Sequence, residues 1–257
     1  MEERPYEHVK VTVEGAVCTI AIDRPDRKNA IGPRTVNELL YAVDDARDDP
    51  AIRVLVLTGA GAVFSAGGDL QSMAMGDLPP RGDYADLLLR FRSLGKPTIA
   101  RGNGLALGGG LGIVASCDLA VAAESAVLGT PEVRRGLWPM MIMAVLARVM
   151  SRRSLLTLML LGETLSAARA AELELVTETV PDDHLDARVG ELATALAAQS
   201  PTALRLGLAA YHRMADMRLE EAVPYLRDQL YAMLGTEDAQ EGLRAFRERR
   251  PPVWTGR

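Results

Sequence analysis

The chain has 257 residues, of which 48% are hydrophobic and 25% charged, a composition typical of a globular protein with a sizeable core. Its formal net charge of −5 and its scattered arginines give no sign of a nucleic-acid or anionic-membrane partner. The two cysteines, Cys18 and Cys117, lie in apolar runs and suit a reducing compartment rather than a disulfide framework. The N-terminus lacks the apolar segment of a secretory signal, and no apolar run approaches the ~20 residues of a membrane helix. We therefore expect a cytoplasmic protein.

The first elements in chain order are a hairpin, a helix and a buried strand. Residues 9–14 alternate in polarity and residues 16–22 are nearly all apolar, with Glu14-Gly15 between them, which predicts a β-hairpin. Residues 33–48 have apolar side chains at helical spacing and begin with proline, which suits a first helical turn. The apolar run at 53–59 predicts a buried strand in a parallel sheet.

Strands and helices continue to alternate until about residue 182. A short helix is expected after the GGDL sequence at 67–70, a helix at 84–94, and strands within 96–104 and 117–124. Beyond residue 182 the patterns are helical only, at 184–199, 203–214, 218–234 and 237–250. The pattern predicts an α/β protein whose last third is a helical layer.

Four glycines stand close together within the apolar stretch 104–122: Gly108, Gly109, Gly110 and Gly112. Each costs about 0.5–1 kcal/mol relative to alanine, because glycine loses more backbone entropy on folding. Such a cluster indicates either tight packing or close approach of the backbone to a ligand. The spacing fits neither GxGxxG nor the phosphate-binding GK[ST] motif. The functional interpretation left is an oxyanion site, with backbone N–H groups aimed at a developing negative oxygen.

Five motifs, in this order, resemble the enoyl-CoA hydratase/isomerase family, which has the crotonase fold. They are RPDRKNAIG at 24–32, FSAGGDL at 64–70, GLALGGG at 104–110, TPEVRRGL at 130–137 and EGLRAFRERRPP at 241–252. The resemblance implies a spiral of ββα units over residues 1–195 that holds the acyl-CoA site. Residues 196–257 would then form a helical region for oligomerisation and complete part of the CoA site. Such proteins assemble as homotrimers or as hexamers made of two trimers.

The resemblance also implies the site residues. The N–H groups of Gly68 and Gly109 would hold the thioester oxygen as an enolate forms, and Glu132 would be an acid–base group. The backbone near Asn29, Ala30, Ala66 and Asp69 would bind the adenine of CoA. Phe246 and Arg249 would lie near the CoA nucleotide, often across a subunit contact, because a guanidinium group grips phosphate well.

One feature departs from the hydratase pattern. Hydratases have a second glutamate three residues beyond the oxyanion glycine, and this chain has Gly112 there. Met140 and Met141 replace a glycine-rich turn and make the site more apolar. A single carboxylate favours proton transfer between C2 and C4, that is, Δ3-Δ2-enoyl-CoA isomerisation, and burial would raise its pKa. The alternatives are 2-enoyl-CoA hydration, decarboxylation or C–C cleavage on the same scaffold, and an acyl-CoA binder without activity.

The remaining expectations concern the acyl group and cofactors. Trp138 and the nearby methionines are expected to line the acyl pocket or to pack in the core, and segment 71–83 is expected to cover the acyl end. CoA is part of the substrate, so no separate cofactor is expected. No metal is expected either, since the sequence has no ligand cluster.

Overall fold

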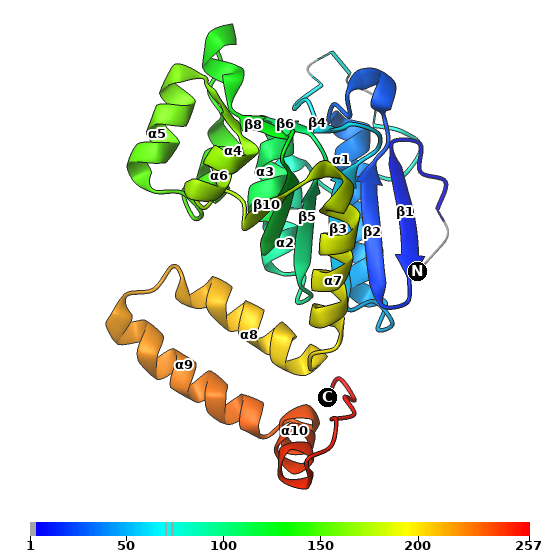
Figure 1. Ribbon diagram of the computed structural model, residues 1–257, viewed down its shortest axis with the longest axis vertical. Helices are drawn as coiled ribbons and strands as arrows, with labels where there is room; N and C mark the ends of the chain where they lie inside the picture. Colours follow the sequence, from blue (N-terminus) through cyan, green and yellow to red (C-terminus); the bar gives the residue numbers. More distant parts are fainter. Residues whose placement is uncertain (1–3, 70, 73–74) are drawn as a thin grey trace.

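The computed structural model describes residues 4–69, 71–72 and 75–257. Its centre is a six-stranded sheet of order β1-β2-β3-β5-β7-β10 (Figure 1). The pairing is antiparallel between β1 and β2 and parallel between the other neighbours. The strands of this sheet are β1 (Val9–Glu14), β2 (Val17–Ile22), β3 (Val54–Gly59), β5 (Thr98–Gly102), β7 (Leu119–Ala123) and β10 (Glu178–Val180).

A smaller sheet of order β4-β6-β8-β9 lies beyond the end of the large one. Its strands are β4 (Val63–Ser65), β6 (Leu105–Leu107), β8 (Val127–Gly129) and β9 (Thr164–Ser166). The chain passes three times from a strand of the large sheet to a strand of the small one: β3 to β4, β5 to β6 and β7 to β8. A helix follows each pair, which makes the spiral of ββα units that defines the crotonase fold.

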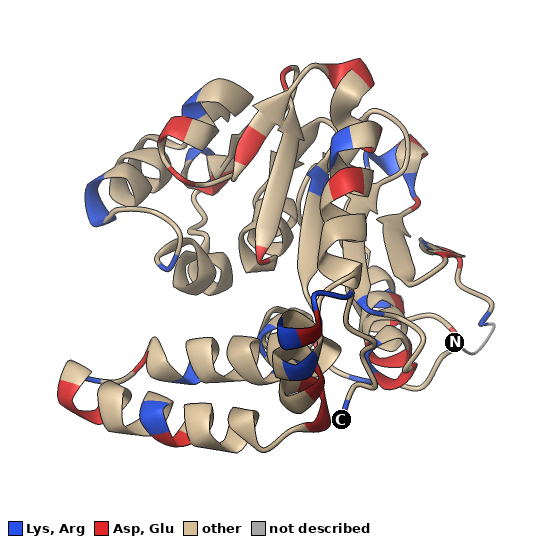
Figure 2. Cartoon of the chain, turned by 60° about the horizontal axis from the view of Figure 1, so that its bottom comes forward, with Lys and Arg blue, Asp and Glu red and all other residues tan. Residues whose placement is uncertain are grey.

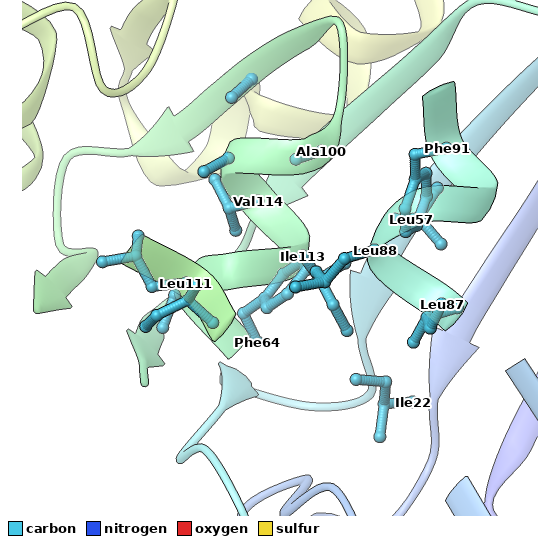
Figure 3. Packing of buried hydrophobic residues seen from close by; sticks show 14 of the residues in the cluster. Ile22, Leu57, Phe64, Leu87, Leu88, Phe91, Ala100, Leu111, Ile113 and Val114 are labelled. Atoms are coloured by element: carbon cyan, nitrogen blue, oxygen red, sulfur yellow. The ribbon is translucent and has the colours of Figure 1, made fainter. Parts of the chain in front are cut away.

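Helices cover both faces of the large sheet. The first face packs against α1 (Pro33–Asp48), α2 (Tyr84–Arg92) and α3 (Gly109–Ser116), and it forms the larger hydrophobic core. Figure 3 shows Leu88 of α2 and Ile113 of α3 pointing toward each other, with Phe64 of β4 beside Ile113. The second face packs against α7 (Leu185–Ala197) through Leu185, Val189 and Ala193. Because both faces are covered, β3 is buried along its whole length.

Short helices follow the β7–β8 pair: α4 (Met140–Leu146), α5 (Arg152–Leu161) and α6 (Ala167–Glu172). The described residues also form 3₁₀ helices, which are η1 (Pro25–Arg27), η2 (Pro131–Arg135) and η3 (Asp182–His184). The chain ends in α8 (Pro201–Met214), α9 (Leu219–Leu234) and α10 (Glu237–Glu248), which extend away from the sheets (Figure 1). Figure 2 shows that α8 and α9 carry charged residues over only part of their length. Within the described ranges, the structure has no helix with the length and apolar character needed to span a membrane.

Most of the elements predicted from the sequence are confirmed. The hairpin, the helix at 33–48, the buried parallel strand, the helix that begins at Tyr84 and the helical last third all occur. The short helix expected after GGDL falls in part on residues 70, 73 and 74, which lie outside the described residues. Gln71 and Ser72, which are described, are not helical. The boundary predicted at residue 195 lies in the last turn of α7.

Candidate active site

Three parallel strands of the small sheet deliver the predicted site residues to one edge. β4 ends at Ser65 and leads into the turn with Gly68; β6 ends at Leu107 and leads to Gly109; β8 ends at Gly129 and leads to Glu132. The register aligns these ends, because Leu107 pairs with Gly129. Since parallel strands end at the same edge of a sheet, three turns far apart in sequence meet there.

The glycines let these turns approach one another closely. Gly108 has φ +50°, and a Cβ there would lie 2.8 Å from Oε1 of Glu132. A Cβ on Gly110 would lie 2.6 Å from Cβ of Ser65 on β4. Gly67, with φ +98°, lies against the carbonyl of Leu107, so the first glycine turn packs directly on the second. The glycine cluster therefore serves packing and the site at once, because a side chain at these positions would push the turns apart.

Gly68 and Gly109 present N–H groups for which the structure describes no acceptor. The hydrogen bonds on either side of Gly68 join other backbone groups. Ile31 N–H donates to Gly67 O at 2.8 Å, and Asp69 N–H donates to Ile31 O at 2.9 Å. Gly109 is the first residue of α3, where N–H groups have no partner within the helix. Both glycines line a cavity of about 720 Å³. Two such donors, one of them at the N-terminus of α3, can together hold a negatively charged oxygen.

Glu132 lies in the same cavity, in η2 directly after Pro131. Its Oε2 is buried and has no hydrogen-bond partner among the described residues. Burial raises the pKa of the Glu132 carboxyl, and its backbone N–H and the charge of Arg135 oppose this rise. A half-buried carboxyl with an unbonded oxygen beside an open cavity can take up and release a proton of a bound ligand.

The position of the absent second glutamate has no free space. A Cβ on Gly112 would lie 2.3 Å from Cγ2 of Ile142 and 2.5 Å from the hydroxyl oxygen of Tyr84. A Cβ atom does not approach another heavy atom to less than 3.0 Å without something shifting, so any side chain at position 112 would displace both Ile142 and Tyr84. The cavity wall thus has an isoleucine methyl group and a tyrosine hydroxyl near the place where a hydratase has its carboxylate.

The rest of the cavity wall is mainly apolar. Trp138, Met140 and Met141 line it, as the sequence predicts, and Met75 of the predicted acyl-covering segment also lines it. Besides Glu132, the charged residues of the wall are Asp83, which caps α2, and Arg135. The sequence analysis did not identify Arg135, Ile142 or Tyr84, since none of them stands in a motif that assigns it a role. The packing around Gly112 reveals Ile142 and Tyr84, whereas Arg135 is an exposed residue of the cavity wall.

The segment before α2 is held firmly against α1. Asn37 accepts a hydrogen bond from the Arg81 N–H at 2.8 Å, and its amide donates to the carbonyls of Leu78 and Pro79, each at 3.2 Å. Arg81 also pairs at 2.6 Å with the buried carboxylate of Asp44. These bonds fix the chain that leads to Gly82, Asp83 and Tyr84 at the cavity.

The residues expected at the CoA adenine lie in two turns that the structure ties together. Ala66 lines the cavity, and its N–H donates to the carbonyl of Lys28 at 2.9 Å. Asp69 forms an ion pair with Arg24 at 3.0 Å, and the same guanidinium donates to the carbonyl of Ala30 at 2.7 Å.

The Asn29 side chain is fully buried and already used within the protein. Its amide donates to the carbonyls of Ala60 and Val63 at 2.9 and 2.6 Å, and its oxygen accepts from the Arg24 N–H at 2.9 Å. The backbone N–H of Asn29 also donates to the carbonyl of Arg24 at 2.9 Å, so neither the side chain nor the N–H of this residue is free for a ligand.

Phe246 and Arg249 are not brought to this cavity by their own chain. They lie in and just after α10, among the helices that extend away from the sheets (Figure 1), and Phe246 is 84% exposed. Neither residue is among those that line the cavity. A role at a CoA site would therefore need the α10 helix of another subunit.

Comparison with known proteins finds relatives along nearly the whole chain. The family model for enoyl-CoA hydratase/isomerase matches residues 12–257. A probable enoyl-CoA hydratase of Mycobacterium bovis is 34% identical, over 98% of this chain and 99% of the relative. A mevalonyl-coenzyme A hydratase of Aspergillus fumigatus is 35% identical, over 93% of this chain and 91% of the relative. The crystal structure of an enoyl-CoA hydratase subunit from Geobacillus kaustophilus superimposes with a TM-score of 0.89 at 36% identity, covering 98% of this chain and 99% of the other.

The fold and the site define an acyl-CoA enzyme of the crotonase type. The chain belongs to the enoyl-CoA hydratase/isomerase family.

Proposed function

We propose that this enzyme isomerises 3-enoyl-CoA thioesters to 2-enoyl-CoA thioesters, with Glu132 as its single acid–base residue. The Glu132 carboxylate takes a proton from C2, and the electron pair moves through the thioester onto its oxygen to form a dienolate. The N–H groups of Gly68 and Gly109 stabilise that oxygen, which is worth about 10²–10³ in rate for one such donor. The protonated Glu132 then returns the same proton to C4.

The observation that carries this proposal is the filled space at position 112. Addition of water needs one group to activate the water and one to deliver the α-proton, whereas isomerisation needs one group that does both in turn. Ile142 and Tyr84 occupy the place of a second carboxylate and leave no room for a side chain there. The raised pKa of Glu132, caused by burial, suits a group that alternates between base and acid.

A second candidate is hydration of 2-enoyl-CoA thioesters. It is favoured by the names of the relatives, which include a probable enoyl-CoA hydratase and a mevalonyl-coenzyme A hydratase. Hydration by this chain would require a water molecule activated without a carboxylate at position 112.

The test compares two substrates on the purified protein. We expect fast conversion of 3-hexenoyl-CoA, which is measured by the absorbance of the conjugated thioester. We expect slow hydration of crotonyl-CoA, which is measured by the mass of the product. Fast hydration would overturn the proposal in favour of the second candidate. Inactivity on both, with CoA esters still bound, would point to decarboxylation, C–C cleavage or binding without turnover.

We further propose that the CoA nucleotide is bound between two subunits. The backbone at Asn29, Ala30, Ala66 and Asp69 would contact the adenine, and Phe246 and Arg249 of a neighbouring subunit would close the site. The exposed apolar residues of α9 and α10 support an assembly, which we propose to be a trimer or a pair of trimers. These residues are Leu219, Val223, Leu226, Leu230, Tyr231, Leu234, Leu243 and Phe246.

A further inference from the structure

The Tyr84 side chain packs against Gly109 in the glycine turn of the site. Its ring lies against Gly109, where a Cβ would be 3.5 Å from both Cζ and the hydroxyl oxygen. Its hydroxyl donates a hydrogen bond of 2.5 Å to the carbonyl of Gly109. Among the described residues, it is the one side chain that hydrogen bonds to residues 108–110.

This turn needs external support, because its own residues restrain it little. Gly108, Gly109 and Gly110 follow one another, and glycine restricts its backbone less than any other residue. A backbone bond from Gly108 N–H to Gly129 O at 3.0 Å holds one end of the turn, and the helical bond from Gly112 N–H to Gly108 O at 3.0 Å holds the other. The second bond also restrains the Gly109 N–H, the proposed oxyanion donor, because this N–H shares a peptide unit with Gly108 O. The next peptide unit, which contains the carbonyl of Gly109, is the one that Tyr84 holds.

Tyr84 is itself well anchored. It is the first residue of α2, directly after Asp83, whose carboxylate accepts hydrogen bonds from the N–H groups of Ala85 at 2.8 Å and Asp86 at 3.1 Å. The preceding residues are tied to α1 through Asn37 and Asp44, as described above. Burial raises the pKa of the Tyr84 phenol far above its ordinary value, and the charge of Glu132 adds to the rise, so the hydroxyl remains a donor.

We propose that Tyr84 is a positioning residue of the oxyanion site, whose hydroxyl holds Gly109 so that its N–H stays aimed at the thioester oxygen. This inference rests on the proposed function, since it assumes that the oxygen binds at Gly68 and Gly109. It also assigns a purpose to the filled space at position 112: the hydroxyl that excludes a side chain there is the one that fixes the turn.

The test is Tyr84→Phe, which removes one oxygen atom and leaves the ring packed. Because one hydrogen bond contributes modestly, we expect kcat for 3-hexenoyl-CoA to fall about 2- to 12-fold, with KM changed less than about twofold. A second readout needs no turnover. A bound 2,4-dienoyl-CoA absorbs at longer wavelength when hydrogen bonds polarise its thioester carbonyl, and we expect a smaller shift in the variant. The matched control is Tyr6→Phe, which loses a 3.4 Å hydroxyl bond to Asp45 outside the cavity and should leave the shift unchanged.

The outcomes separate this inference from the proposed function. A wavelength shift in the parent protein that is smaller in Tyr84→Phe supports both. An equal shift and equal kcat in the variant would overturn the positioning role alone. Loss of all turnover in Tyr84→Phe would overturn it as well, because the hydroxyl would then be a proton donor in the reaction. No shift in the parent protein would overturn the oxyanion site and the positioning role together.

Discussion

The chain up to Ala197 and the three helices that follow it differ in how they bury apolar side chains. In the first region, large apolar side chains from both sheets and from α1, α2, α3 and α7 fill continuous cores. In α9, Ala222 is the one buried residue, while Leu219 and Tyr231 are 73% and 65% exposed.

Charged groups show the same contrast. In the first region, the buried carboxylate of Asp44 is paired with Arg47, Arg81 and Arg90. The described ion pairs of α9 join neighbouring exposed residues, such as Arg227 with Asp228, and such pairs contribute little to stability. The first region therefore contains the candidate cavity within one chain, whereas α9 and α10 leave large apolar side chains exposed, which we propose to contact another subunit. The following experiments test this division.

The largest expected effect is that of Glu132→Gln. The variant loses the single acid–base group, and we expect isomerisation of 3-hexenoyl-CoA to fall about 10³-fold. Binding of CoA esters and the oligomeric state should not change, because Glu132 lies in the first region. The control is Glu124→Gln, which alters an exposed glutamate after β7. Retained turnover in Glu132→Gln would remove this residue from the mechanism.

The next effect concerns the exposed face of α9. We expect the double substitution Val223→Asp and Leu230→Asp to dissociate the oligomer, since each places a charge on an exposed apolar position. Affinity for CoA esters should weaken about tenfold or more, because Phe246 and Arg249 would no longer reach a neighbouring site. Light scattering and titration calorimetry measure the two effects. Val13→Asp, at a 46% exposed position of β1, is the control. A monomeric parent protein would contradict the division itself.

The dependence on pH follows from the raised pKa of Glu132. As a base the carboxyl must be ionised, so kcat/KM should fall about tenfold per pH unit below its pKa, with a midpoint above the ordinary value of 4.5. The stability of the fold depends on pH in the opposite direction to the activity. A folded-state pKa above the unfolded one means that the neutral form stabilises the fold at low pH, and this contribution is lost as pH rises through the folded pKa. Accordingly, Glu132→Gln should not lower the melting temperature at pH 8. A midpoint at or below 4.5 would show that burial does not control this group.

The smallest expected effect is a gained activity. Gly112→Glu alone should distort the site, because the new Cβ would displace the side chains of Ile142 and Tyr84. Combined with Tyr84→Phe and Ile142→Ala, it should give slow but measurable hydration of crotonyl-CoA. The matched control has the two relieving substitutions and retains Gly112. Equal hydration by the triple variant and this control would show that the second carboxylate does not decide between the reactions.

Much of the fold was predictable, because periodicity and turn residues act over short distances. The hairpin around Gly15, the helix that starts at Pro33 and the buried strand of β3 all follow from local patterns. The glycine motifs and the PE sequence also led to Gly68, Gly109 and Glu132, which line one cavity. The roles of these residues and of the proposed CoA contacts stay predictions.

What the sequence by itself determined is which residue types stand in each turn, including the glycine at position 112 where a hydratase has glutamate. Tertiary structure alone decided what fills the space left by that glycine. Tyr84 and Ile142 come from the starts of α2 and α4, which lie 28 residues before and 30 residues after Gly112, and only packing brings them together. Local patterns do not encode such a contact, because it depends on how whole helices pack against the sheet edge.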